Sequence, residues 1–136
     1  MTNSIKPDIW GPGGWKFIHY VSLGYPDKPN QADKLNYKNF YTSLQHILPC
    51  EKCAMNYSDN LTKYPIDDHL QTKDALVKWT IDIHNQVNNE LNKNELNYDD
   101  ALSLYTTESS DTGDYLFKLA VLIIILYFLY LVIKNK

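Results

Sequence analysis

Residues 72–91, TKDALVKWTIDIHNQVNNEL, carry the clearest structural pattern in the chain. Their apolar side chains recur every three or four positions, as they do on one face of a helix. These positions are Leu76, Trp79, Ile83, Val87 and Leu91. A helix with one apolar face has to bury that face against other elements, so the stretch predicts a helix packed within a small domain.

The sequence before this stretch predicts two more long helices. One is expected over 14–23, after a Gly/Pro-rich turn. Asn30 can cap the next helix, with Asp33 at its third position. Aromatic and aliphatic residues then recur at helical spacing until Pro49 interrupts the pattern.

Shorter helices are predicted to start at Cys50 and near Asn97, where Asp99 and Asp100 suit a first turn. No stretch alternates as a half-buried strand would. The predicted fold class is therefore all-α, a small four-helix bundle with a short fifth helix.

The C-terminal part of the chain is far more apolar than the rest. Residues 115–133 are rich in Leu, Ile, Tyr and Phe, with Lys118 as their single charge. This length is enough to span a bilayer, so a C-terminal transmembrane helix is expected, with a buried core helix as the alternative. The predicted organisation is a domain over 1–105, a polar linker over 106–114 and a membrane anchor over 115–133.

Charge and composition exclude some partners. The chain has 13 Lys and Arg against 16 Asp and Glu, a net charge of −3, and it contains no Arg. Nucleic acid is not an expected partner of such an acidic protein. The N-terminus shows no apolar signal-peptide core, so the domain is expected in the cytosol.

The two cysteines lie three residues apart, in Leu48-Pro49-Cys50-Glu51-Lys52-Cys53. A helix that starts at Cys50 stabilises a thiolate there and brings both sulfurs within disulfide distance, so Cys50 is expected to be the exposed, attackable sulfur. Zinc binding is an alternative, although four ligands are needed and no second close pair exists. A thioredoxin-like protein is a weaker alternative, because no strand precedes the motif.

Two of the predicted helices each carry a pair of ring or amide side chains at the same spacing. Trp15 and His19 are four residues apart, and so are His84 and Asn88, so each pair shares a helix face. Ordinary core packing explains any one of these residues alone. The repetition, together with the amide-rich run after His84, suggests a surface that can hydrogen-bond a heterocycle.

These motifs together resemble the Erv/ALR-type sulfhydryl oxidases, which are small FAD-binding helical bundles with members in large DNA viruses. The resemblance covers about residues 10–98. The residues that carry it are Trp10-Gly11, Trp15, His19, Tyr25-Pro26, the Cys50–Cys53 motif and the run from His84 to Lys93.

The resemblance implies an FAD-dependent thiol oxidase that makes disulfides in partner proteins and passes electrons through Cys50, Cys53 and flavin to oxygen, giving hydrogen peroxide. Cys50 would accept electrons from the partner, and Cys53 would face the flavin. The implied cofactor-binding residues are Gly11, Trp15, His19, Tyr57, His84, Asn85, Val87, Asn88, Lys93 and Tyr98. A non-enzymatic, membrane-tethered adaptor with an incidental or zinc-binding cysteine pair is the alternative.

The sequence departs from the family at several points. Many members carry a second cysteine pair on a flexible arm, which is absent here, and Asn92 stands where Gly is frequent. A separate small dithiol protein is therefore expected as shuttle or substrate. A homodimer is also expected, with aromatic surface on the first two helices, and viral relatives suggest a virion membrane as the location. The aromatic residues in question are Phe17, Tyr20, Tyr37 and Tyr41.

Overall fold

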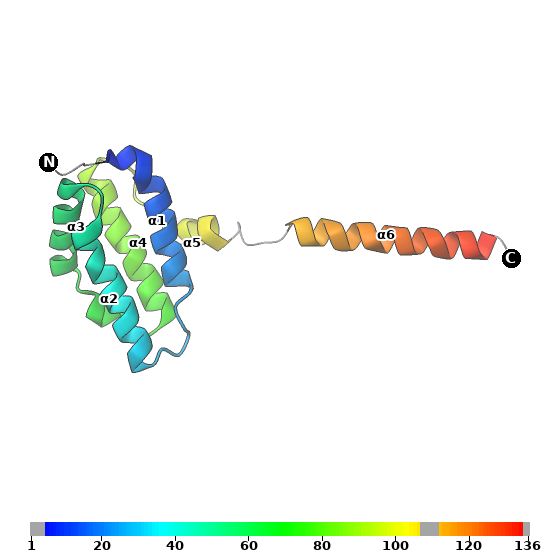
Figure 1. Ribbon diagram of the computed structural model, residues 1–136, viewed down its shortest axis with the longest axis horizontal. Helices are drawn as coiled ribbons and strands as arrows, with labels where there is room; N and C mark the ends of the chain where they lie inside the picture. The colour runs from blue at the N-terminus through cyan, green and yellow to red at the C-terminus, as the bar shows by residue number, and fades with distance from the viewer. Residues whose placement is uncertain (1–4, 107–111, 135–136) are drawn as a thin grey trace. The chain divides into compact units, whose positions relative to one another are not determined.

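The structure is a computed structural model that describes residues 5–106 and 112–134. Figure 1 shows the order of its elements. They are α1 (Pro7–Leu23), α2 (Gln31–Ile47), α3 (Glu51–Lys63), the 3₁₀ helix η1 (Ile66–His69), α4 (Lys73–Glu90), α5 (Tyr98–Thr106) and α6 (Thr112–Lys134). No strand occurs in the described residues, so the all-α prediction is confirmed. Contacts divide the chain into two compact units, 1–105 and 106–136.

Helix α1 starts seven residues earlier than predicted, at Pro7 instead of Gly14. The Gly/Pro-rich stretch before Trp15 therefore lies inside the helix, with Pro12 in its interior. Tertiary contacts offset the poor helix propensity of this stretch. A Cβ at Gly14 would lie 3.1 Å from the Trp10 ring, so the absence of a side chain there lets the indole pack closely.

Side chains cap the starts of α2 and α4, as was predicted for α2. The Asn30 side chain accepts hydrogen bonds from the backbone of Ala32 and Asp33, at 2.8 and 3.0 Å. The Asn30 backbone N–H in turn donates to the Asp33 carboxylate at 2.8 Å, which completes a capping box. Thr72 caps α4 through the backbone N–H of Ala75.

The main core lies among α1, α2, α3 and α4, which run alongside one another in Figure 1. Trp79 fills its centre and packs edge-on against Tyr41, with ring centroids 5.2 Å apart. The indole N–H of Trp79 also donates to the Tyr64 carbonyl at the end of α3. A second cluster, centred on Val77, Ile81 and Ala101, holds α5 against α4.

The predicted apolar stripe of α4 holds for its first three turns only. Leu76, Trp79 and Ile83 are buried, but Leu91 is 55% exposed. Asn88 is buried instead. The face of α4 that looks into the bundle thus becomes polar toward the helix end, which periodicity alone could not show.

Helix α6 covers the whole of the segment 115–133 that was predicted to be an anchor. Across 5–106 and 112–134, however, no helix is found that is long and apolar enough to cross a membrane, so the structure does not support the predicted transmembrane helix. The prediction rests partly on side chains outside the described set, including those of residues 112–116. The predicted linker lies mostly outside the described residues, and α6 begins within it at Thr112.

Candidate functional site

The cysteine pair sits where α2 ends and α3 begins. Helix α2 stops before Pro49, whose ring is incompatible with a continuing helix. Cys50 is the N-cap of α3, and its sulfur accepts a hydrogen bond from the Cys53 backbone N–H at 3.2 Å. The two residues form a disulfide with Cα atoms 5.1 Å apart. The prediction that one helical turn brings the two sulfurs together is confirmed.

The two sulfurs differ in exposure, and not in the predicted sense. Cys50 is only 6% exposed, whereas Cys53 is half-buried. The prediction that Cys50 is the exposed sulfur is therefore wrong for this disulfide state. Sequence reasoning placed Cys50 at a helix start, but it could not show what packs around that start.

The N-terminal segment is tied to the residue that precedes Cys50. The backbone N–H of Ile5 donates to the Pro49 carbonyl at 2.8 Å. The Trp10 indole N–H donates to the Ile5 carbonyl at 3.2 Å. These two bonds connect the first turns of α1 to the cysteine motif, 40 residues further along the chain.

A column of four rings from α1, α4 and α5 forms the second part of the site. Trp15 stacks on His84 with centroids 4.0 Å apart and planes within 8°. His84 and His19 share a hydrogen bond of 3.0 Å between Nδ1 and Nε2. Tyr105 stacks on His19 at 4.4 Å. We call Trp15, His84, His19 and Tyr105 the aromatic column.

The two histidines of the aromatic column are uncharged at neutral pH. Burial and the charge of His84 lower the pKa of His19 to about 3. Burial and the charge of Lys93 lower the pKa of His84 to about 4. One ring nitrogen of the His19–His84 bond therefore donates and the other accepts, as two neutral imidazoles can.

Tyr105 was missed by sequence reasoning. It is the last aromatic residue of α5, one helical turn beyond Ala101, which is fully buried. Tyr98, Ala101 and Tyr105 recur at helical spacing. This periodicity was the available signal that the face of α5 bearing Tyr105 turns toward the bundle.

The polar end of α4 shapes the loop that follows it. The Asn85 amide bonds to both the N–H and the carbonyl of Leu96, at 2.8 and 3.0 Å. Asn92 adopts a left-handed conformation with φ 53°. The backbone N–H of the next residue, Lys93, donates to the Asn88 carbonyl at 2.8 Å. Asn85 thus fixes the loop, while Lys93 is exposed close to His84.

The other predicted site residues lie at several places in the bundle. Gly11 and Val87 are half-buried on α1 and α4. Tyr57 is buried on α3 and donates to the Tyr41 carbonyl at 3.1 Å. Tyr98 is the first residue of α5 and packs against the second cluster.

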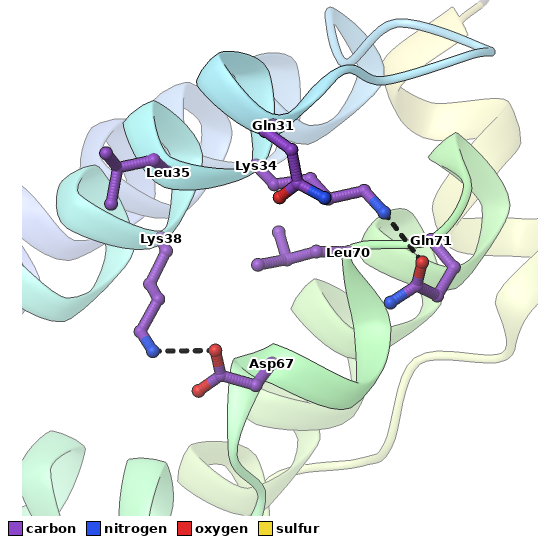
Figure 2. Close-up of a pocket in the computed structure, with 7 residues that line it drawn as sticks. All are labelled: Gln31, Lys34, Leu35, Lys38, Asp67, Leu70 and Gln71. Atoms are coloured by element: carbon purple, nitrogen blue, oxygen red, sulfur yellow. Dashed lines mark hydrogen bonds and ion pairs between the residues drawn. The ribbon is translucent and has the colours of Figure 1, made fainter.

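A separate cavity of about 300 Å³ lies between α2 and η1, as Figure 2 shows. Its two lysines already have partners: Lys34 donates to Gln71 at 2.7 Å, and Lys38 pairs with Asp67 at 2.6 Å. The cavity adjoins the first turns of α2, whereas the cysteine pair follows its last turn. A 17-residue helix is about 25 Å long, so the two places are distinct.

A metal site has no support in the part of the chain that the structure describes. No three His, Cys, Asp or Glu side chains there lie close enough to hold an ion. Zinc needs four such ligands at a structural site. The described residues therefore provide no set of ligands with which the cysteine pair could bind zinc.

A helical bundle that carries a C-x-x-C disulfide at the start of its third helix defines a class of small thiol–disulfide redox proteins. The chain belongs to the Erv1 / Alr family, which matches residues 12–107. A relative from Acanthamoeba polyphaga mimivirus, named "Probable FAD-linked sulfhydryl oxidase", is 48% identical over 72% of this chain and 69% of its own.

Two further comparisons agree with this membership. The FAD-linked sulfhydryl oxidase of African swine fever virus (isolate Warthog/Namibia/Wart80/1980) is 28% identical, over 78% of this chain and 87% of its own. The crystal structure of the FAD binding domain of Erv1 from Saccharomyces cerevisiae superposes with a TM-score of 0.66 at 25% identity. It covers 70% of this chain and 89% of the solved chain.

Proposed function

We propose that this protein is an FAD-linked sulfhydryl oxidase that makes disulfides in partner proteins. The observation that supports this proposal most directly is the Cys50–Cys53 disulfide on the first turn of α3 in an Erv1 / Alr bundle. A disulfide within one helical turn can cycle with its dithiol without moving the rest of the fold. The alternative of a non-enzymatic adaptor has no comparable support.

The donor set of the site fits FAD. The aromatic column offers flat surfaces for a fused ring system, and its two histidines are neutral, so they can donate or accept. Asn88 adds a buried amide, and Lys93 supplies an exposed cation near His84 for phosphate. In the absence of Arg, Lys and backbone N–H groups have to serve the phosphates.

The reaction begins at the disulfide. A thiolate of the partner attacks one sulfur of the pair, so that a mixed disulfide forms and the other cysteine leaves as a thiolate. The second partner thiol then resolves the mixed disulfide, and the partner leaves oxidised while Cys50 and Cys53 become a dithiol. The N-cap position of Cys50 stabilises a thiolate there through the Cys53 N–H and the helix dipole.

FAD supplies the two-electron chemistry that returns the dithiol to the disulfide and reduces oxygen to hydrogen peroxide. Cys53 is assigned to the flavin side and Cys50 to the partner side, following the family resemblance. Because Cys50 is buried in the disulfide state, a docking partner has to displace what covers it.

The test uses the purified full chain. We expect a yellow protein with FAD bound, which consumes oxygen and releases hydrogen peroxide when dithiothreitol is added. Cys50→Ser and Cys53→Ser should each abolish turnover while the bound FAD stays. A colourless protein, or a yellow one whose oxygen uptake survives both substitutions, would contradict the proposal.

The partner is proposed to be a small dithiol protein, because Cys50 and Cys53 are the chain's only cysteines and no second pair can relay electrons. Cys53→Ser should trap this partner as a mixed disulfide at Cys50, and non-reducing electrophoresis with mass spectrometry would identify it. If the partner is trapped on Cys50→Ser instead, the assigned roles of the two sulfurs are reversed.

Membrane attachment through the apolar residues of α6 stays a prediction from sequence, because no membrane-spanning helix is found among the described residues. Expressing the chain with and without residues 112–136 tests it. Retention of the full chain in carbonate-washed membranes, with release of the shortened one, would support attachment. Recovery of both in the supernatant would contradict it.

A homodimer through α1 and α2 is proposed from exposed aromatic surface. Phe17 is 59% exposed and Tyr20 37% exposed. Of the other residues predicted for this surface, Tyr41 is fully buried and Tyr37 packs edge-on against Tyr25. Tyr41 therefore belongs to the core, and the proposed surface is centred on Phe17.

A further inference from the structure

A single carboxylate joins the helix of the cysteine pair to the helix of the aromatic column. The Glu90 side chain, at the end of α4, accepts a hydrogen bond from Asn56 at 2.7 Å and another from Asn60 at 3.2 Å. Both asparagines lie on α3. Asn60 is only 1% exposed, so its amide depends on this partner for satisfaction.

These bonds define how α3 and α4 lie together. At the other end of the pair, the Trp79 indole donates to the Tyr64 carbonyl at 2.9 Å. The two helices are therefore antiparallel, with Asn60 and Asn56 facing the last turn of α4. Cys53 precedes Asn56 by about one turn and lies on the same face, level with the end of α4.

The contacts of α3 with α2 do not duplicate this connection. Tyr57 and Ser58 donate to Tyr41 and Gln45 of α2 and hold α3 against α2. Among the residues that the structure describes, the two bonds to Glu90 are the only hydrogen bonds between α3 and the last turn of α4. Beyond core packing, the hydrogen bonds that hold α3 against the last turn of α4 thus depend on one side chain.

We propose that Glu90 is a positioning residue that sets the separation of Cys53 from the cofactor surface on α4. The inference rests on the proposed function, because the cofactor surface is the one formed by His84 and Asn88. The two accepted bonds resist both rotation of α3 and sliding of α3 along α4, which a single bond would not. Electron transfer from a dithiol needs close, aligned contact, and a displacement of 1 Å can slow a reaction by about 100-fold.

Glu90→Ala removes both bonds. Glu90→Gln has one accepting oxygen in place of two, so it can keep only one of the two bonds. The matched control is Glu95→Ala. Glu95 is also exposed and accepts an amide bond of 2.7 Å, from Asn89, but it does not touch α3. All four proteins are the full chain, loaded with FAD.

The measurement is the rate at which dithiothreitol bleaches the visible flavin band without oxygen, together with the FAD content of each protein. We expect Glu90→Ala to hold FAD but to be reduced at least about tenfold more slowly than the wild type. Glu95→Ala should stay within about threefold of the wild type, and Glu90→Gln should fall between the wild type and Glu90→Ala. The disulfide equilibrium with dithiothreitol in the FAD-free protein should be unchanged in Glu90→Ala, because the disulfide lies within one turn of α3.

Each other outcome has a defined meaning. Wild-type reduction rates in Glu90→Ala overturn the inference and leave the proposed function intact. Equal slowing in Glu95→Ala and Glu90→Ala overturns it too, because loss of a nearby carboxylate, and not of the connection to α3, would then be responsible. A shifted disulfide equilibrium would show that Glu90 acts on the disulfide itself. A wild type that binds no FAD contradicts the proposed function instead.

Discussion

The His19–His84 pair links the site to the stability of the folded protein. Both histidines have a pKa below the ordinary value of 6.5 because they are buried. The unfolded chain therefore binds more protons than the folded one as the pH falls below 6.5. The folded state therefore keeps its full stability above pH 6.5, where both rings are uncharged. Its unfolding free energy falls as the pH drops from 6.5 toward 4.

We expect the unfolding free energy of the FAD-free protein to fall between pH 6.5 and 5, with a slope of about 1.4 kcal/mol per pH unit for each histidine. Urea unfolding at several pH values measures it. His84→Gln should reduce the slope. A flat profile in the wild type would show that the rings accept protons in the folded state.

The backbone conformation of Asn92 has a measurable cost in unfolding free energy. Its φ of 53° is uncommon for a residue with a side chain, although Asn tolerates it better than most. Asn92→Ala should lower the unfolding free energy by about 1 kcal/mol. Asn92→Gly should leave that energy unchanged or raise it slightly. Equal effects of the two substitutions would mean that the loop does not need the left-handed conformation.

Local residue types predict the start of one helix correctly and the start of another wrongly. The capping box of α2 was predicted from Asn30 and Asp33 alone, because its bonds join residues three positions apart. The start of α1 was predicted wrongly, because the Gly/Pro-rich stretch before Trp15 was interpreted as a turn. Packing of Trp10 on Gly14 and its bond to Ile5 decide that start, and neither is visible in helix propensity.

The capping box should be measurable on its own. Asn30→Ala removes an acceptor for two backbone N–H groups, so the unfolding free energy should fall by about 1 kcal/mol. Asn36→Ala, at an exposed position within α2, is the control and should change it by less than about 0.5 kcal/mol. An unchanged unfolding free energy in Asn30→Ala would mean that the cap does not stabilise α2, because helix propensity alone favours Ala over Asn.

Self-association is the property of the whole molecule that follows from its surface. If α1 and α2 form a dimer, Phe17→Asp places a charge in the interface and should weaken the dimer at least about tenfold. Sedimentation velocity over a range of concentrations measures this change. Leu104→Asp, at another exposed apolar position, should not alter association. A wild type that is monomeric at every concentration would contradict the proposed dimer.

The sequence by itself determined the features whose parts lie within one or two helical turns. These include the Cys50–Cys53 disulfide, the cap of α2 and the helical character of the chain, because bonds between near neighbours depend on local residue types. Only the tertiary structure decided that Trp15 stacks on His84, that Cys50 is buried and that Glu90 joins α4 to α3. These contacts join residues more than 30 positions apart or depend on packing from several helices. Periodicity gives the face of each helix, but only packing fixes the register between faces.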